Sequence, residues 1–324
     1  GIIMNVLVTG GNGLVGSALL TMLLEENHQI TMFDRIFDSE FIDDEEKARI
    51  HFIKGDLASF EHILTAVKES QAEVIYHLGS MLSIPSEADP QTAFKVNGCS
   101  TYHILEAARL FNVRQVIYTS TVTTYGSDLQ SSTVNDFTLQ RPTTMYGINK
   151  LLAENLGRYY KQKYGIDFRA VRYSALVGPG AKTKHIGVYN AWMIEKSFLG
   201  EPYEIFVTPE RKATLIYYKD AAGYLIQLSK APIENIKTVC YNLPGHKATA
   251  QDLADCVLKV IPDARLTFNP DEEIMEIFRK KGYVEYDGSN AEKEWNCIPK
   301  YTLEEMVVDF GKEIEKMKAR KLKK

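Results

Sequence analysis

The sequence predicts a doubly wound α/β fold, in which helices cover both faces of a parallel sheet. Short apolar runs rich in Val and Ile alternate with longer segments that have helical periodicity. Runs such as VIYHL and QVIYTS are apolar on both faces, so each must lie between two layers of helices. The chain has 324 residues, of which 45% are hydrophobic. It is therefore long enough for two lobes and can bury a full core without metal ions or disulfides.

The alternation of strands and helices continues through the first half of the chain. Six strands are expected, at Asn5–Thr9, Gln29–Asp34, Arg49–Lys54, Glu73–Leu78, Gln115–Ser120 and Phe168–Val177. Four helices are expected between them, at Leu14–Glu26, Phe60–Glu69, Asn97–Phe111 and Thr144–Lys163. Each helix acts as the crossover that lets two successive strands run parallel.

After Gly178 the periodicity becomes irregular, which predicts a smaller, mainly helical C-terminal lobe. Residues 1–177 are expected to form the first lobe, which residues 213–243 rejoin. The substrate-binding lobe is then built from residues 178–212 and 244–324. The basic tail KMKARKLKK is interpreted as a solvated helix end whose cations suit the helix dipole, with a docking patch as the alternative.

Composition excludes several classes of function. Lys and Arg total 38 against 42 Asp and Glu, so no general positive field exists to bind nucleic acid or anionic lipid. No apolar run is long enough for a membrane helix, and no signal peptide is recognised. The seven histidines form no metal-binding cluster, so no metal is expected. The cysteines make no Cys-x-x-Cys pair, which favours a reducing cytoplasm; they are Cys99, Cys240, Cys256 and Cys297.

A glycine-rich loop follows the first expected strand. In TGGNGLVG the glycines are Gly10, Gly13 and Gly16, and a helix follows at once. A diphosphate needs close backbone approach and gains from the unpaired N–H groups of a helix N-terminus. Glycine triplets also occur for purely structural reasons. The strand before this triplet and the helix after it favour a dinucleotide site.

Acidic residues at later strand ends specify the dinucleotide. Asp34 ends the second strand, 18 residues after Gly16, where a carboxylate accepts hydrogen bonds from an adenosine ribose and repels a 2′-phosphate. NAD is therefore the expected cofactor. Arg35 can bind such a phosphate, so NADP remains the alternative. Asp56, in GDL, is placed to meet the adenine edge, although capping the next helix explains it equally well.

A Tyr-x-x-x-Lys pair supplies the proton-transfer chemistry. Tyr146 and Lys150 are four residues apart, so on a helix they share one face. Lowering a tyrosine pKa from about 10 to about 7 requires roughly 4 kcal/mol of preference for the phenolate. A lysine ammonium and a positive nicotinamide can together provide it. The phenolate then takes the proton of a substrate hydroxyl while hydride leaves the same carbon.

Two further residues are candidates for this catalytic site. Thr121, in YTSTVTTYG, is expected to hold the substrate oxygen in line with the phenol. Asn97, in KVNG, can anchor the Lys150 side of a proton relay, although an ordinary residue at a helix N-terminus is an equally good account.

These motifs, in this order, resemble the extended short-chain dehydrogenase/reductase superfamily, which contains nucleotide-sugar epimerases and dehydratases. The resemblance runs from TGGNGLVG through GDL, HLGS, VNG, TSTVTTYG, MYGINK and VRYSALVGPG. It implies a Rossmann-type lobe that binds NAD, catalysis by Thr121, Tyr146 and Lys150, and a homodimer that packs the helices at 97–111 and 144–163. Besides the residues already named, the residues that it places at the cofactor are Asn12, Leu14, Val15, Leu57, Leu78, Gly79, Tyr173 and Leu176.

Three branches of the superfamily can be compared. Dehydratases carry an acidic pair after the catalytic Ser or Thr, where this chain has Val122 and Thr123. Epimerases tend to have Asn and Arg where this chain has Ala175 and Ala213, which disfavours a UDP-sugar and leaves a nucleotide-sugar epimerase as the alternative. An NAD-binding sensor without catalysis is less favoured, since such modules usually lose the Tyr and Lys pair.

The third branch, the short-chain type of L-threonine 3-dehydrogenase, is the most similar. The similarity includes MLS, QRPTTMYGINK and the tail DGSNAEKEWNCIPKYTLEEM, and it implies that Ser83, Thr121 and Tyr146 contact the substrate. Ile186 and Gly187 depart from that branch because they replace paired threonines. Nearby basic residues are either solvated surface charges or ligands for a substrate carboxylate or phosphate. The ones placed at the substrate are Lys184, His185 and Arg211, with Lys182 and Lys212 beside them.

Overall fold

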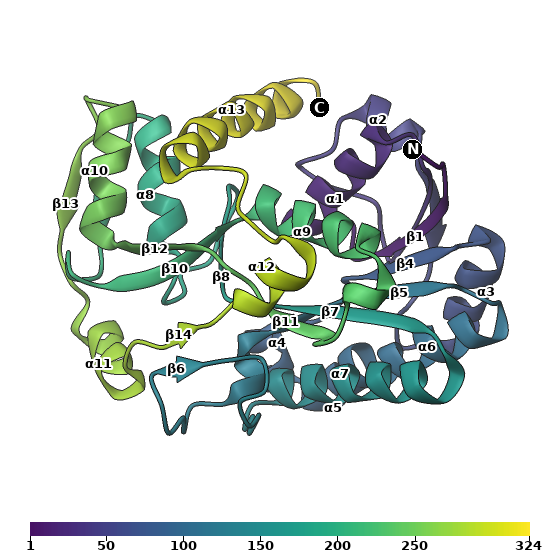
Figure 1. The fold of residues 1–324 in the computed structure, drawn as a ribbon. Coiled ribbons are helices and arrows are strands. Elements are labelled where there is room, and N and C mark those ends of the chain that lie inside the picture. Colours follow the sequence, from purple (N-terminus) through teal and green to yellow (C-terminus); the bar gives the residue numbers. More distant parts are fainter.

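The computed structural model describes residues 1–324, and the larger of its two lobes is built on a seven-stranded parallel sheet (Figure 1). The strand order is β11-β7-β5-β4-β1-β2-β3. The strands are β1 (Asn5–Thr9), β2 (Gln29–Asp34), β3 (His51–Lys54), β4 (Val74–His77), β5 (Gln115–Thr121), β7 (Asp167–Tyr173) and β11 (Cys240–Asn242). The predicted doubly wound parallel sheet is confirmed, and the order reverses between β1 and β4.

Helices cover both faces of this sheet because its strands are apolar on both sides. On β1, Val6 and Val8 join the hydrophobic cluster under α1 (Leu14–Glu25) and α9 (Tyr218–Lys230), which pack against each other. Leu7, between them, points to the opposite cluster. The helices over that face are α3 (Phe60–Ser70), α6 (Ser100–Leu110) and α7 (Met145–Tyr164).

The smaller lobe contains short strands and most of the C-terminal helices. One sheet has the order β12-β10-β8, formed by β8 (Ala175–Val177), β10 (Lys212–Tyr217) and β12 (His246–Thr249). Two strand pairs are β9 (Tyr203–Ile205) with β13 (Leu266–Phe268), and β6 (Thr133–Val134) with β14 (Glu285–Tyr286). The helices are α8 (Tyr189–Phe198), α10 (Ala250–Val260), α11 (Glu272–Lys281), α12 (Ser289–Trp295) and α13 (Leu303–Leu322).

Two predicted segments divide differently between the lobes. The expected strand Phe168–Val177 is interrupted at Ser174: β7 pairs with β5 as far as Tyr173, whereas β8 pairs with β10 of the smaller sheet. Of residues 213–243, α9 and β11 lie on the larger sheet but β10 does not. Strand partners tens of residues away decide these boundaries, and local periodicity does not contain that information.

The predicted helix Asn97–Phe111 begins earlier than expected. The short helices α4 (Ser83–Ala88) and α5 (Pro90–Ala93) lead through a π-helical turn, η1 (Phe94–Cys99), into α6. The α5 helix starts where Pro90 occupies its first turn and the Asp89 carboxylate accepts a hydrogen bond from the amide of Thr92. The remaining short elements are α2 (Asp44–Ala48), η2 (Val122–Tyr125) and η3 (Ile233–Asn235).

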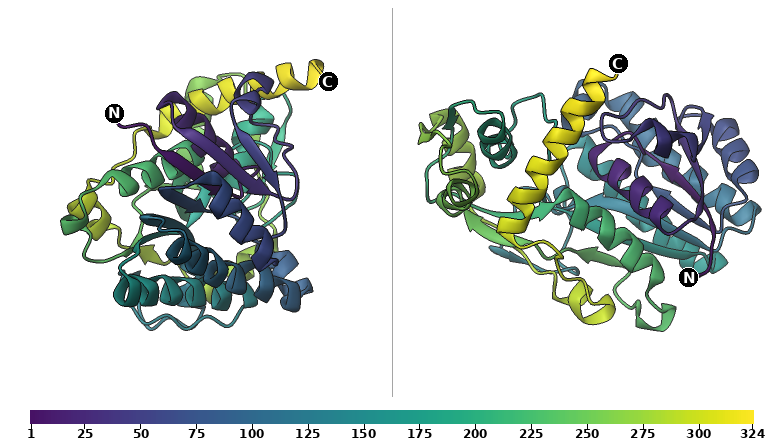
Figure 2. Two further views of the ribbon diagram at one scale, coloured as in Figure 1. Left: turned by 90° about the vertical axis from the view of Figure 1, so that its right-hand side faces the viewer. Right: turned by 90° about the horizontal axis from the view of Figure 1, so that it is seen from above.

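The C-terminal helix connects the two lobes. Its apolar face packs on α8 and α10, and its last turns reach the loop that follows β2 (Figure 2). There Arg320 Nε donates to Asp43 at 2.6 Å. No helix of the protein combines the length and the apolar character needed to cross a membrane.

Candidate active site

The glycine-rich loop joins β1 to α1 at the carboxyl edge of the sheet, and its glycines have different roles. A Cβ on Gly10 would lie 2.6 Å from the backbone nitrogen of Gly79, and one on Gly16 would lie 2.2 Å from the carbonyl oxygen of Gly10. Both positions therefore need glycine for the chain to pack on itself. A Cβ on Gly13 would meet only one atom, at 3.7 Å, so the space beside Gly13 is open.

That open space faces the N-terminus of α1, which no side chain caps. Gly13 is the N-cap residue, and Leu14, Val15 and Gly16 form the first turn. Unpaired amides at a helix N-terminus favour a bound anion. Because glycine has no Cβ, the oxygens of the anion can come close to the backbone. The predicted glycine cradle thus fits a dinucleotide diphosphate.

The end of β2 carries the predicted ribose-binding carboxylate. Asp34 Oδ1 accepts a hydrogen bond from the amide of Arg35 at 2.7 Å, and Oδ2 accepts one from Asn12 Nδ2 at 3.2 Å. Burial raises the pKa of Asp34, and these hydrogen bonds oppose that rise. Asn12 also donates to the carbonyl of Ile36 and so ties the glycine loop to the chain after β2. The Arg35 side chain is exposed at this edge.

The next strand ends complete this edge. The hydroxyl of Thr9 accepts hydrogen bonds from the amides of Leu78 and Gly79, at 3.1 and 3.0 Å. The Leu57 side chain lies against Gly79, since a Cβ there would be 2.6 Å from Leu57 Cδ1. Asp56 Oδ1 accepts from the amide of Ala58 at 2.9 Å and so stabilises a local turn, whereas the cap of α3 is Ser59 and not Asp56.

The structure brings the three predicted catalytic residues to adjacent elements. Thr121 ends β5 and Tyr146 lies in the first turn of α7. The hydroxyl of Thr144 caps α7 by accepting from the amide of Gly147 at 3.2 Å, which fixes where the helix starts. One turn later, Lys150 Nζ lies 5.6 Å from the centre of the Tyr146 ring. The predicted shared face of Tyr146 and Lys150 is therefore present.

The lysine is held firmly and is almost fully buried. Lys150 Nζ donates to the carbonyl of Thr119 at 2.8 Å and lies 4.8 Å from the centre of the Tyr118 ring. Burial lowers the pKa of Lys150 to about 7, and the Glu154 carboxylate one turn further along α7 opposes that change. Burial raises the pKa of Tyr146 to about 12. Burial thus opposes the charged form of both side chains.

Asn97 is not placed as a proton relay to Lys150. Its Oδ1 accepts from the amide of Met81 at 2.7 Å and its Nδ2 donates to the carbonyl of Met81 at 3.1 Å. Both polar ends of the buried side chain are thus used on the loop after β4. Ser83 begins α4 two residues beyond that loop. Asn97 therefore positions the segment that carries Ser83, and the relay hypothesis is wrong for its side chain.

Tyr173 and Leu176 occupy different environments. The buried phenol of Tyr173 donates to the carbonyl of Ala221 in α9 at 2.8 Å, so its side chain fastens α9 to the sheet. Leu176, two residues beyond the break at Ser174, is exposed enough to contact a cofactor. The sequence did not distinguish these two roles because both residues lie in one apolar run.

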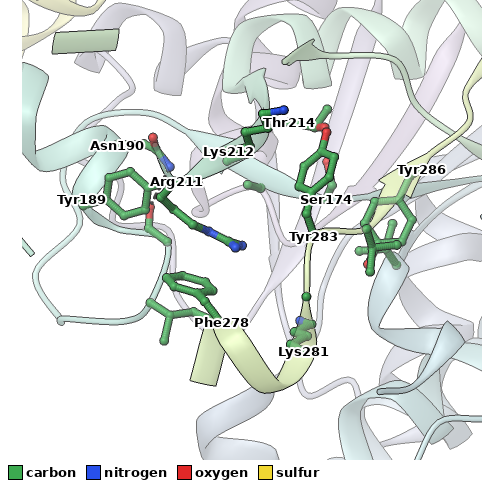
Figure 3. Close-up of a pocket in the computed structure, with 17 residues that line it drawn as sticks. Ser174, Tyr189, Asn190, Arg211, Lys212, Thr214, Phe278, Lys281, Tyr283 and Tyr286 are labelled. Atoms are coloured by element: carbon green, nitrogen blue, oxygen red, sulfur yellow. Dashed lines mark hydrogen bonds between the residues drawn. The ribbon is translucent and has the colours of Figure 1, made fainter. Parts of the chain in front are cut away.

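A cavity of about 240 Å³ lies between the two lobes (Figure 3). Val122, which follows the catalytic Thr121, lines it together with Ser174 at the end of β7. The predicted substrate ligand Arg211 extends into its open centre, and both departures from the dehydrogenase pattern, Ile186 and Gly187, line its wall. The smaller lobe contributes most of the remaining lining, including Asn190, Thr214, Phe278, Tyr283 and Tyr286.

The other predicted substrate ligands lie outside this lining. Lys184 Nζ pairs with Asp271 Oδ2 at 3.1 Å, and Lys182 pairs with Glu40 at 2.9 Å. His185 Nδ1 accepts from the amide of Gly187. The surface interpretation is therefore correct for these three. Sequence reasoning missed Lys281, which lines the cavity from the end of α11, because a lysine in a last helical turn is explained by the helix dipole.

No three His, Cys, Asp or Glu side chains converge in an arrangement suited to a metal ion. The residues at the carboxyl edge of the sheet fit a dinucleotide, since an uncapped helix N-terminus, an open glycine and a strand-end carboxylate follow one another there. The site thus combines a place for the cofactor, a tyrosine beside a lysine, and an adjoining cavity.

Comparisons with known proteins agree with this geometry. The chain is 27% identical over 312 residues to the mitochondrial L-threonine 3-dehydrogenase of Bos taurus, which covers 93% of this chain and 80% of that protein. The GalE-like L-threonine dehydrogenase of Cupriavidus necator, in its holo form, has a TM-score of 0.80 and 26% identity over 94% of this chain and 98% of that one. The L-threonine dehydrogenase of Clostridium difficile has a TM-score of 0.85 and 25% identity, covering 98% and 99%.

The family described as the NAD dependent epimerase/dehydratase family matches residues 6–243, nearly three quarters of the chain. The match begins in β1 and ends one residue after β11, so it spans every strand of the larger sheet. The cofactor is NAD, and the protein is an enzyme of the dehydrogenase and epimerase type. The chain belongs to the NAD dependent epimerase/dehydratase family.

Proposed function

We propose that this enzyme oxidises a secondary alcohol, the β-hydroxyl of a small hydroxy acid or β-hydroxy amino acid, with L-threonine as the first candidate. The observation that carries the proposal is the meeting of Tyr146, Lys150 and Thr121 beside a small cavity. Similarity to several L-threonine dehydrogenases supports the same reaction. The roles of individual residues below are part of this proposal.

Bound NAD supplies the acceptor for the hydride that leaves the alcohol carbon. The residues that hold it are those of the glycine loop, Asp34 at the ribose, and Leu57, Leu78 and Gly79 at the carboxyl edge of the sheet. Asp34 favours NAD over NADP because its carboxylate repels a 2′-phosphate. Lys150, anchored on the carbonyl of Thr119, keeps its remaining N–H donors beside the tyrosine.

Thr121 orients the substrate hydroxyl and Tyr146 removes its proton. Thr121 Oγ1 is held in place because it accepts from the amide of Thr123 at 3.1 Å and donates to the Thr123 hydroxyl at 3.0 Å. The Tyr146 phenolate and the Lys150 ammonium stabilise each other, since opposite charges at close range favour both ionised forms. The proton of the alcohol therefore passes to the phenolate oxygen as the carbonyl forms.

A nucleotide-sugar epimerase has the same catalytic residues but also needs ligands for a nucleoside diphosphate. Ala175 and Ala213, both in the cavity lining, stand where epimerases tend to have Asn and Arg. A sensor that has lost catalysis is disfavoured because Tyr146 and Lys150 are both in place.

The reaction is tested by following the ultraviolet absorbance of NADH with L-threonine, other 3-hydroxy acids and UDP-glucose. We expect Tyr146→Phe to lower kcat/KM by about 10²-fold or more, because proton transfer by a positioned side chain contributes on that order. Tyr164→Phe, at the far end of the same helix, is the matched control. Full activity of Tyr146→Phe, or interconversion of UDP-sugars without accumulation of NADH, would contradict the proposal.

The pH profile tests the role of the lysine. The phenolate is the form that accepts the proton, so kcat/KM should rise with pH until Tyr146 is ionised. Burial raises the pKa of Tyr146 to about 12 in the protein alone. Lys150 and the bound nicotinamide must therefore shift the rise in kcat/KM to lower pH. Lys150→Met should displace the rise toward higher pH. An unchanged profile would show that Lys150 does not stabilise the phenolate.

The remaining proposals concern the whole chain. Residues 175–217 and 244–324 form the substrate lobe, since the β12-β10-β8 sheet belongs to it and these residues contribute most of the cavity lining. The protein works in the reducing cytoplasm, because all four cysteines are free. It forms a homodimer through α6 and α7, whose outer faces are apolar.

A further inference from the structure

The cavity between the lobes has a strongly unbalanced charge. Its 17 lining residues include Arg211, Lys212 and Lys281 but no Asp or Glu. None of these three cations takes part in an ion pair, whereas Lys184, outside the lining, pairs with Asp271 at 3.1 Å. Arg211 is partly buried, so its charge without an acidic partner in the cavity requires an explanation.

Arg211 and Lys281 line the same cavity. The guanidinium of Arg211 lies 3.6 Å from the centre of the Phe278 ring, which fixes its direction into the open space (Figure 3). Lys281, three residues after Phe278, approaches from the end of α11. Desolvation and the positive charge of Arg211 both lower the pKa of Lys281. Like charges held this way are unfavourable, and an anion between them would stabilise both.

Neutral hydrogen-bond donors lie in the same wall. The hydroxyl oxygens of Ser174 and Thr214 are buried and have no hydrogen-bond partner in the protein. Both residues line the cavity. Buried polar atoms are rarely left unpaired, so two of them beside two unpaired cations indicate a missing polar ligand. Hydroxyl and guanidinium donors together suit the oxygens of an anion.

Val122, which follows Thr121 in the chain, lines the cavity, so the cavity lies next to the end of β5. We propose that the substrate carries a doubly negative oxyanion group, bound by Arg211 and Lys281 while its hydroxyl lies at Tyr146. A phosphate monoester or a pair of carboxylates supplies such a group. This inference rests on the proposed function for the hydroxyl end. L-Threonine, with one carboxylate and an ammonium, leaves one of the two cations unmatched.

Binding of inorganic phosphate to the NAD-bound enzyme tests the anion site without any turnover. We expect phosphate to raise Tm, and malonate to do so as the dicarboxylate probe, whereas chloride at equal ionic strength has little effect. Arg211→Gln and Lys281→Gln should each weaken phosphate binding by about tenfold or more, as measured by calorimetry. Lys280→Gln, the exposed neighbour on α11 that does not line the cavity, is the matched control.

The substrate itself is tested in the NADH assay with phosphorylated and dicarboxylic hydroxy acids beside L-threonine. A kcat/KM higher than that of L-threonine, lost in Arg211→Gln but kept in Lys280→Gln, supports the inference. Circular dichroism of each variant verifies its fold. The inference is overturned if all variants bind phosphate with equal affinity. It is also overturned if Arg211→Gln leaves the KM of every substrate unchanged.

The two proposals can fail separately. If phosphate binds through Arg211 but no alcohol yields NADH, the proposed reaction is wrong and the anion site remains. If L-threonine is oxidised with Arg211→Gln unimpaired and phosphate does not bind, only the anion site is wrong. If UDP inhibits the enzyme at a concentration about 10²-fold lower than phosphate does, the site binds a nucleoside diphosphate. That result would overturn the proposal of a small substrate.

Discussion

At the scale of single residues, glycines of one motif are required for different reasons. Gly16 has no room for a Cβ, because it would lie 2.2 Å from the carbonyl oxygen of Gly10. Gly13 has room, and its φ of −71° suits any residue. The motif in the sequence does not separate them. Only the packing shows that Gly16 serves the fold, whereas Gly13 leaves space for a ligand.

This difference predicts two distinct variants. Gly13→Ala should fold with nearly unchanged Tm but bind NAD about tenfold more weakly or worse, since the added methyl occupies the diphosphate side of the loop. Gly16→Ala should lower the free energy of unfolding by about 1–3 kcal/mol, because the backbone must move to admit a Cβ. Thermal unfolding and calorimetric titration with NAD separate the two effects. Equal loss of stability in both variants would refute this division of roles.

At the scale of elements, the C-terminal helix is linked to the cofactor site through one loop. Arg320 contacts Asp43 at 2.6 Å and the carbonyl of Glu40 at 3.1 Å. The same loop is held from the other side by Asn12, whose Oδ1 accepts from the amide of Asp38 at 3.0 Å. The basic tail stays largely exposed, as a solvated helix end should. Two of its residues, Arg320 and Lys324, pair with acidic residues of the loop after β2.

We expect Arg320→Gln to weaken NAD binding by roughly two- to fivefold, because exposed ion pairs contribute up to about 1 kcal/mol. High ionic strength should weaken wild-type binding in the same direction and reduce the difference. Lys259→Gln is the matched control, since it breaks an exposed pair with Glu304 at the opposite end of α13. An NAD affinity that falls equally in both variants would point to a general effect on the helix.

At the scale of the whole molecule, one surface remains to be covered. The outer faces of α6 and α7 expose Tyr102, Ile148 and Tyr159, each with more than 40% of its surface accessible. Adjacent apolar side chains on two packed helices form a patch of the kind that a second copy covers by twofold symmetry.

Light scattering should therefore report about twice the chain mass of 36.7 kDa. Ile148→Glu and Tyr159→Glu should shift the protein toward the monomer, because a carboxylate in an apolar interface is costly to desolvate. Leu139→Glu, on an exposed loop outside these helices, should leave the dimer intact. A wild-type protein that is monomeric at micromolar concentration would refute the homodimer.

The sequence by itself determined the central sheet, its covering helices, and the ends of strands and helices at which the candidate cofactor-binding and catalytic residues lie. Both β1 and β2 begin and end where periodicity places them, because a strand buried on two faces needs an unbroken apolar run. The glycine loop, Asp34, Thr121, Tyr146 and Lys150 follow from short spacings that geometry fixes within one element or turn. Local patterns of this kind need no knowledge of distant contacts.

Only the tertiary structure decided what lies between elements that are far apart in sequence. One apolar run is interrupted at Ser174, so that its two parts belong to different sheets. The Asn97 side chain bonds to Met81 and not to Lys150. The tertiary structure also placed Arg211 and Lys281, 70 positions apart, at one cavity without a counter-ion. Charge balance in a cavity depends on which side chains fold together, and no local spacing encodes that.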